Sequence, residues 1–219
     1  MLNQDKENYS LILHSQSEKF FSAGADLNQF NHDDKGRSFE FATAFGSAFE
    51  ALANYEGVSI AAITGYAMGG GLEVALSCDV RICEEQAQMA LPEASVGLLP
   101  CGLGSQQLSW LVGEGWAKRM ILLGERIKAQ QAEKIGLVSE VVPTGTVLDH
   151  AFKLAQKVEK QSPTSVRFCK ELIMQARSGD INSAYTKERE LFVKLWDSQD
   201  QKEGVGAFVD KRKPQWKNC

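Results

Sequence analysis

The chain has 219 residues, of which 43% are apolar and 24% are charged, and its formal net charge is −4. This length fits one large domain, or one domain with a smaller appendage, and the mixed charges disfavour disorder. The negative charge argues against a general nucleic-acid or anionic-membrane surface. No apolar run approaches the ~20 residues of a membrane span, and the polar start has no signal-peptide core. We therefore expect a cytoplasmic protein with no membrane or nucleic-acid partner.

The first 145 residues alternate predicted strands and helices. Short apolar or β-branched runs predict strands at 9–14, 58–63, 79–83, 89–91 and 137–142. Helical spacing predicts helices from residue 38, from the glycine cluster to residue 76, and at 105–112, 116–123 and 129–134. A polar loop is expected at 31–37. The helix from residue 38 carries an apolar stripe, which favours a core-facing side over a cofactor site: Phe41, Phe45, Phe49 and Leu52.

After Pro143 the pattern becomes almost wholly helical, with helices predicted at 146–160, 163–178, 181–199 and 201–212. The sequence thus predicts an α/β core over residues 1–145 and a helical region over 146–219. Large apolar residues on these helices could be buried within the chain or against a neighbouring subunit: Phe192, Leu195, Trp196 and Phe208.

One glutamate, Glu73, follows a glycine cluster at the predicted start of a helix. Glycine lets the backbone approach a ligand closely, and the first N–H groups of a helix point outward without partners. The N–H of Gly70 could therefore bind a thioester oxygen. Positions i and i+3 share a helix face, so Glu73 should project toward whatever Gly70 binds. Its apolar neighbours Leu72 and Val74 should raise its pKa by desolvation.

A second glutamate, Glu93, follows Pro92, and Ala25 follows Gly24 where it could supply a second backbone N–H. Two carboxyl groups can position a water, remove its proton and deliver a proton elsewhere. Taken singly, these features are more often a tight turn, an exposed helix residue and a helix start. Their combination indicates the addition of water to a double bond conjugated to a carbonyl.

Five cysteines, an odd number without a C-x-x-C pair, predict buried free thiols rather than disulfides or a zinc site. These are Cys78, Cys83, Cys101, Cys169 and Cys219. The three histidines are scattered along the chain and predict no metal-ligand cluster. We expect no metal and no resident cofactor.

Motifs along nearly the whole chain resemble the crotonase, or enoyl-CoA hydratase/isomerase, superfamily. They lie at 22–27, 65–75, 78–82, 92–100, 123–127, 135–138 and 206–214. The resemblance implies a crotonase-like ββα spiral core over 1–145 and a C-terminal helical trimerisation region over 146–219, assembled as a homotrimer or homohexamer. Members of the superfamily carry a further N-terminal segment, so the resemblance also implies a core without the usual first strands.

The resemblance also implies roles for individual residues. Ala25 and Gly70 would form the oxyanion hole, and Glu73 and Glu93 would be the catalytic pair. Cys101 stands where hydratases usually have a glycine whose N–H helps to position the water. The remaining implied contacts are with coenzyme A: Ala23, Asp26, Leu27 and Asn28 in one loop, and Phe208 and Lys211, in many members from a neighbouring subunit. The alternative for Lys211 is a solvated charged tail.

The predicted function is hydration of a 2-enoyl-CoA to a 3-hydroxyacyl-CoA, with coenzyme A as part of the substrate. One alternative is a Δ3-Δ2 enoyl-CoA isomerase that uses Glu93 alone. Another is a non-catalytic acyl-CoA-binding subunit, or an RNA-binding relative, although the negative charge weighs against RNA. The presence of both glutamates favours hydration.

Overall fold

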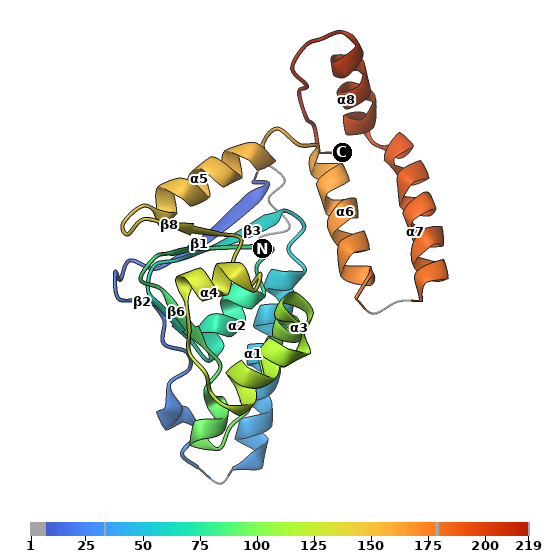
Figure 1. Cartoon of the computed structure of the whole chain (residues 1–219). Helices are drawn as coiled ribbons and strands as arrows, with labels where there is room; N and C mark the ends of the chain where they lie inside the picture. Colours follow the sequence, from blue (N-terminus) through green and yellow to red (C-terminus); the bar gives the residue numbers. More distant parts are fainter. Residues whose placement is uncertain (1–7, 33, 178–179, 219) are drawn as a thin grey trace. The chain divides into compact units, whose positions relative to one another are not determined.

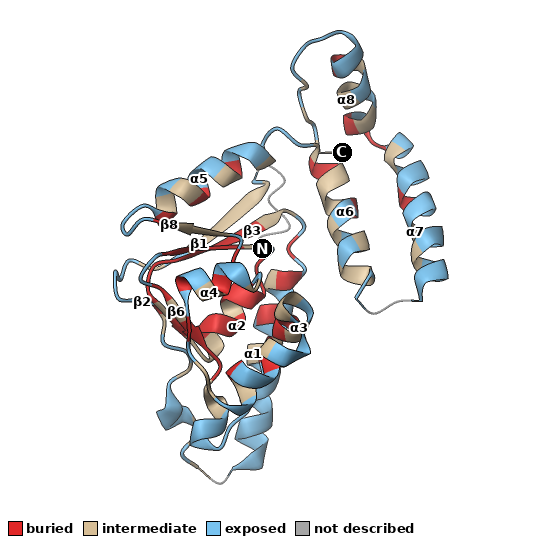
Figure 2. Cartoon of the chain, viewed as in Figure 1, coloured by how far each residue is buried: buried red, intermediate tan, exposed pale blue. Residues whose placement is uncertain are grey.

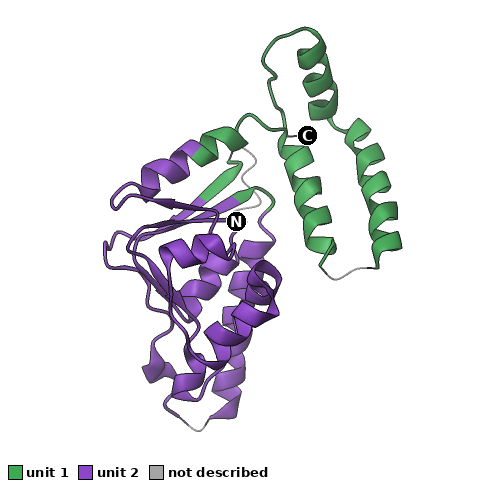
Figure 3. Cartoon of the chain, viewed as in Figure 1, with its two compact units in different colours: residues 1–11, 56–58, 154–219 green, residues 12–55, 59–153 purple. Residues whose placement is uncertain are grey.

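The computed structural model of the protein describes residues 8–32, 34–177 and 180–218. The chain divides into two compact units (Figure 3). The larger unit comprises residues 12–55 and 59–153, and the smaller unit comprises residues up to 11, 56–58 and those from 154 onward. The domain division at residue 145 stays a prediction. Three predictions fall partly or wholly outside the described residues. They concern the loop at 31–37, the helix at 163–178 and the thiol of Cys219.

The strands form two four-stranded sheets (Figure 1), and β1 to β6 alternate between them along the chain. One sheet has the order β1 (Ser10–His14), β3 (Val58–Ile63), β5 (Val80–Glu84) and β8 (Glu140–Val142). The other has the order β2 (Phe20–Ser22), β4 (Tyr66–Met68), β6 (Gln88–Ala90) and β7 (Ile127–Lys128). The β3–β5, β5–β8, β2–β4 and β4–β6 pairs are parallel, whereas β6 and β7 are antiparallel.

An α-helix follows each of the first three pairs of strands. The order along the chain is β1, β2 and α1 (Lys35–Ala53), then β3, β4 and α2 (Gly70–Leu76), then β5, β6 and α3 (Gly104–Leu122). α4 (Ala129–Lys134) lies between β7 and β8, and two short 3-10 helices, η2 (Leu27–Phe30) and η3 (Glu93–Val96), follow β2 and β6. This repetition confirms the predicted α/β class and ββα spiral.

The core of the larger unit is built around α2, which is mostly buried (Figure 2). Leu72 and Leu76 of this helix pack in one cluster with Ile63 and Met89 from neighbouring strands. Strands buried on both faces read as continuous apolar runs, and residues 59–63 of β3 are all buried. The apolar run at 58–63 therefore predicted this strand well.

Helix boundaries differ from the predictions where a side chain or a glycine decides them. α1 begins at Lys35 because the Asp34 carboxylate accepts hydrogen bonds from the N–H groups of Gly36 and Arg37. α3 is interrupted at Gly113, which has φ 76° and ψ 161°. This break separates the two helices that were predicted at 105–112 and 116–123.

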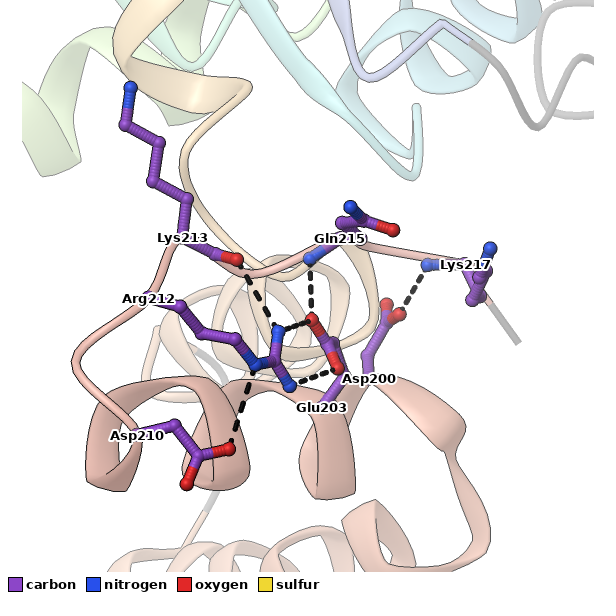
Figure 4. Close-up of polar contacts among 7 residues, drawn as sticks. All are labelled: Asp200, Glu203, Asp210, Arg212, Lys213, Gln215 and Lys217. Atoms are coloured by element: carbon purple, nitrogen blue, oxygen red, sulfur yellow. Dashed lines mark hydrogen bonds and ion pairs between the residues drawn. The ribbon is translucent and has the colours of Figure 1, made fainter.

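The C-terminal part of the chain is helical, as predicted. Its elements are α5 (Val147–Val158), α6 (Pro163–Gln175), α7 (Ile181–Lys194), η4 (Leu195–Asp197) and α8 (Gln199–Val209). The buried Asp200 carboxylate accepts a hydrogen bond from the backbone N–H group of Lys217 (Figure 4) and another from that of Asn218. The last residues are thereby fastened to α8. Within the described residues, no helix is both long and apolar enough to cross a membrane.

Candidate active site

A cavity of about 530 Å³ lies in the larger unit, and its wall contains both predicted glutamates and both predicted N–H donors. Ala25 comes from the loop after β2, Gly70 and Glu73 from α2, and Glu93 from η3. Segments that are far apart in the sequence are brought together because β2, β4 and β6 are neighbours in one sheet.

Gly24 brings the two N–H donors together. It has φ 91°, a conformation that suits glycine, and a methyl group built on it would lie 2.8 Å from the Met68 carbonyl oxygen. A methyl group built on Gly70 would in turn lie 3.7 Å from the Ala25 nitrogen. Gly70 begins α2, where N–H groups have no partner within the helix. The backbone nitrogens of Ala25 and Gly70 therefore lie near one another in the cavity wall, and their joint binding of one oxygen atom stays a prediction.

Glu73 is 2% exposed and is fixed by the loop that precedes α3. Its Oε1 accepts hydrogen bonds from the backbone N–H groups of Gly102 at 2.8 Å and Gly104 at 2.9 Å. A methyl group on Gly104 would lie 2.6 Å from this same oxygen, so the loop needs glycine to approach the carboxylate. Burial raises the pKa of Glu73, and the backbone N–H groups of Gly104, Gly102 and Cys101 oppose this by stabilising the charge.

Glu93 has different surroundings, although it lies in the same cavity wall. Its two carboxyl oxygens are buried and have no hydrogen-bond partner among the described residues. Burial raises the pKa of Glu93, its own backbone N–H lowers it, and the negative charge of Glu73 raises it further. A buried carboxyl group without a partner is costly. We therefore interpret it as a group that is held ready for a ligand.

Cys101 also lines the cavity, next to Gly102 in the sequence. Partial burial raises the pKa of its thiol, and the charges of Glu73 and Glu93 raise it further. A neutral thiol is a weak nucleophile. Cys101 is therefore a poor candidate for a nucleophile, and its role in positioning water stays a prediction.

The rest of the wall is mostly apolar and includes three aromatic rings, those of Phe30, Phe41 and Phe45. Glu73 and Glu93 are the only charged residues among the described ones that line the cavity. Elsewhere in the described chain, no group of three or more histidine, cysteine, aspartate or glutamate residues could hold a metal ion.

Comparison with known proteins decides the family. The model of the enoyl-CoA hydratase/isomerase family matches residues 1–219. The chain belongs to this family. It is 36% identical to the short-chain-enoyl-CoA hydratase of Clostridium acetobutylicum, over 97% of this chain and 81% of that protein. It is 38% identical to the 2,3-dehydroadipyl-CoA hydratase of Escherichia coli K12, over 91% of this chain and 77% of that protein.

Solved structures of relatives show the same fold. The structure of Pseudomonas aeruginosa DspI is 59% identical with a TM-score of 0.95, over 99% of this chain and 82% of that chain. The enoyl-CoA hydratase of Bacillus anthracis is 33% identical with a TM-score of 0.94, over 100% of this chain and 84% of that chain. The crotonase-like fold implied by the sequence motifs is confirmed.

The structure places some of the residues that family membership implied around the cavity, and others elsewhere. The ones that line it are Ala23, Ala25, Leu27, Gly70, Glu73, Glu93 and Cys101. Asp26 instead caps η2, because its Oδ1 accepts hydrogen bonds from the backbone and side-chain nitrogens of Asn28. Phe208 and Lys211 belong to the smaller unit, where Phe208 is 85% exposed. Their contact with coenzyme A stays a prediction.

Two features of this family member were not predicted from the sequence. The first is the pair of N–H donors to Glu73, from Gly102 and Gly104. Their G-x-G spacing after Pro100 indicated only a loop. The second is the aromatic wall of the cavity. Phe41 and Phe45 were expected in the core, but they line the cavity. Of the three phenylalanines in the predicted stripe, only Phe49 is buried.

Proposed function

We propose that this protein hydrates a 2-enoyl-CoA thioester to a 3-hydroxyacyl-CoA. The observation that carries the proposal is one cavity whose wall has two backbone N–H donors and two glutamates with different surroundings. The two relatives whose names denote hydratases of CoA thioesters support it. Coenzyme A is part of the substrate, and the proposed steps use only groups of the protein.

The two N–H donors act on the thioester oxygen. When water adds to C3 of the substrate, negative charge develops on this oxygen. The N–H groups of Ala25 and Gly70 stabilise that charge, and because they are fixed by the backbone they need no reorganisation during the reaction.

The two glutamates divide the transfer of protons. Glu73 is held through Oε1 by the Gly102 and Gly104 N–H groups, which leaves Oε2 to accept the proton of the attacking water. Burial raises the pKa of both glutamates, but Glu93 lacks the donors that stabilise the charge of Glu73. Glu93 therefore acts as the acid that protonates C2. The water oxygen bonds to C3 as its proton passes to Glu73, and Glu93 gives its proton to C2. Release of the proton from Glu73 and uptake of one by Glu93 then restore the pair for the next turnover. The two acids interact, so their titrations belong to the pair.

Coenzyme A would bind at the mouth of the cavity, along the loop that contains Ala23 and Leu27. We further propose a homotrimer or a homohexamer, in which Phe208 and Lys211 of a neighbouring subunit complete the site. Several large apolar side chains of α7 and α8 are exposed, as such an interface requires: Phe192, Val193, Val205, Phe208 and Val209. Light scattering coupled to size exclusion would test the assembly, and a monomer would contradict it.

We place the protein in the cytoplasm. Its four described cysteines are thiols outside disulfides, which suits a reducing compartment. Cys78 and Cys83 are buried as predicted, whereas the prediction of burial was wrong for Cys101 and Cys169, which are exposed. Cell fractionation with antibodies against the protein would test this location, and recovery from a secreted fraction would contradict it.

The decisive experiment follows the ultraviolet absorbance of the conjugated thioester in crotonyl-CoA. We expect a rapid loss with the wild-type protein, and a loss slowed by about 10²–10⁴-fold in Glu93→Gln, as for a removed general acid. Glu114→Gln is the matched control, since Glu114 is an exposed residue of α3 that pairs with Lys118. Dialysis against EDTA should leave the rate unchanged. A wild-type rate that Glu93→Gln preserves would refute this mechanism.

A further inference from the structure

Four phenylalanine rings form a continuous row in the larger unit, which we call the aromatic ladder: Phe30, Phe41, Phe45 and Phe49. Neighbouring ring centroids are 4.7, 5.3 and 4.4 Å apart in that order. The last three rings are four residues apart on α1 and therefore share one helix face. Phe30 extends the row from η2.

The inner end of the ladder touches the backbone that carries the catalytic groups. A methyl group on Gly102 would lie 2.0 Å from Cδ2 of Phe49, so this buried ring packs directly on the glycine whose N–H binds Glu73. A methyl group on Gly70 would lie 2.6 Å from Cζ of Phe45. One ring thus supports the Glu73 loop and the next supports the oxyanion hole.

The outer end of the ladder lines the cavity, through Phe30, Phe41 and Phe45. Leu98 and Leu99 add apolar surface. The charged residues of the described wall, Glu73 and Glu93, are both acidic. A substrate tail in contact with these rings gains from apolar burial, whereas a carboxylate at its end would be desolvated without a cationic partner.

We propose that the aromatic ladder selects substrates with an uncharged aliphatic tail and also positions Gly70 and Glu73 for the reaction. This inference rests on the proposed hydration. In it, Phe41 is a specificity-determining residue, and Phe49 is a positioning residue that acts through Gly102.

The selectivity test compares two substrates of equal carbon count, trans-hex-2-enoyl-CoA and 2,3-dehydroadipyl-CoA, which differ by a terminal carboxylate. We expect wild-type kcat/KM to favour the hexenoyl thioester by about 100-fold, the scale of an unpaired polar group in a binding pocket. Phe41→Arg should reduce this preference by about 10-fold or more, because it supplies a cation to the wall. Phe39→Arg is the matched control, since Phe39 lies on α1 but is 74% exposed. Equal use of both substrates by the wild type would overturn the selectivity.

The positioning test uses Phe49→Leu, with Phe39→Leu as its control. We expect kcat for hex-2-enoyl-CoA to fall by about 10-fold or more while KM changes little, because a misplaced group costs rate rather than ground-state binding. The acid limb of the pH profile of kcat should also shift, as the surroundings of Glu73 change. A variant that loses only thermal stability, with kcat per folded molecule and pH profile unchanged, would overturn the positioning role.

A binding measurement separates this inference from the proposed reaction. Calorimetry with the saturated thioesters hexanoyl-CoA and adipyl-CoA needs no turnover. Tighter binding of hexanoyl-CoA, weakened by Phe41→Arg, would support the selectivity even in a protein that hydrated nothing. Hydration of crotonyl-CoA together with equal binding of the two saturated thioesters would support the reaction and overturn the selectivity.

Discussion

The cavity and α8 each contain a glutamate, Glu93 and Glu203, and their two carboxyl groups are treated in opposite ways. Glu203 accepts hydrogen bonds from the Arg212 guanidinium and the Gln215 N–H (Figure 4), which lower its pKa to about 2. Glu93 has no partner among the described residues, and burial raises its pKa. A carboxylate whose hydrogen bonds all come from its own chain stabilises the fold. A carboxyl group without such hydrogen bonds remains available to a substrate.

Glu73 and Asp200 refine this contrast, since both are buried and both accept backbone N–H groups. Asp200 uses both carboxylate oxygens, one for the N–H groups of Lys217 and Asn218 and the other for hydroxyl groups that include that of Thr164. Glu73 accepts the Gly102 and Gly104 N–H groups through Oε1 alone and lines the cavity. Backbone donors can therefore orient the proposed catalytic carboxylate through one of its two oxygens.

The largest test of the contrast is Glu73→Gln. We expect hydration of crotonyl-CoA to fall by about 10²–10⁴-fold, because the amide cannot accept the proton of water. The fold should persist, since the amide oxygen can still accept hydrogen bonds from Gly102 and Gly104. Ultraviolet absorbance assays would measure the rate of hydration, and circular dichroism would measure whether the fold persists. If Glu73→Gln instead kept full activity on a Δ3-enoyl-CoA, the isomerase alternative that uses Glu93 alone would replace hydration.

A smaller loss is expected from Gly104→Ala. The added methyl group would lie 2.6 Å from Oε1 of Glu73, so the carboxylate or the loop must move. A displacement of about 1 Å can cost about 10²-fold in rate, and we expect kcat to fall on that scale. Gly115→Ala on the same helix is the control, because a methyl group there meets no atom within 4 Å. Equal kcat values for the two variants would contradict the proposed fit.

The pH dependence of stability should distinguish Glu93 from Glu203 by sign, because the pKa of Glu93 is raised and that of Glu203 is lowered. A raised pKa means that the folded state binds the proton of Glu93 more tightly than the unfolded chain does. Its contribution to the unfolding free energy therefore falls as pH rises from the ordinary value of 4.5 through the raised pKa. Glu93→Gln should remove that decline, as measured by urea unfolding at a series of pH values. A variant that declined as steeply as the wild type would count against the buried, unpartnered carboxyl.

The sequence motifs were sufficient to identify the fold because glycine clusters and apolar strands are local features. The run at 58–63 and the glycines before Glu73 each decide their structure within a few residues. The N–H donors to Glu73 could not be predicted, because Gly102 and Gly104 lie 29 and 31 residues farther along the chain. The aromatic stripe was assigned to the core because spacing shows which side chains share a face and not what that face contacts.

The smallest effect is expected from Glu203→Gln, which should leave kcat unchanged. The pKa of Glu203 is lowered to about 2 first by the Arg212 hydrogen bonds, so its stabilising contribution is present above the ordinary value of 4.5 and is lost as pH falls toward 2. The wild type should unfold at slightly higher urea than Glu203→Gln at neutral pH, and the two midpoints should converge in acid. Because Glu203 is at the surface, salt should reduce the difference between the two urea midpoints.

Glu93→Gln should change stability in the opposite direction. At neutral pH its urea midpoint should be higher than that of the wild type, and the difference should be largest there. If the urea midpoints of Glu93→Gln and Glu203→Gln both moved in the same direction from the wild type, the contrast between Glu93 and Glu203 would be wrong.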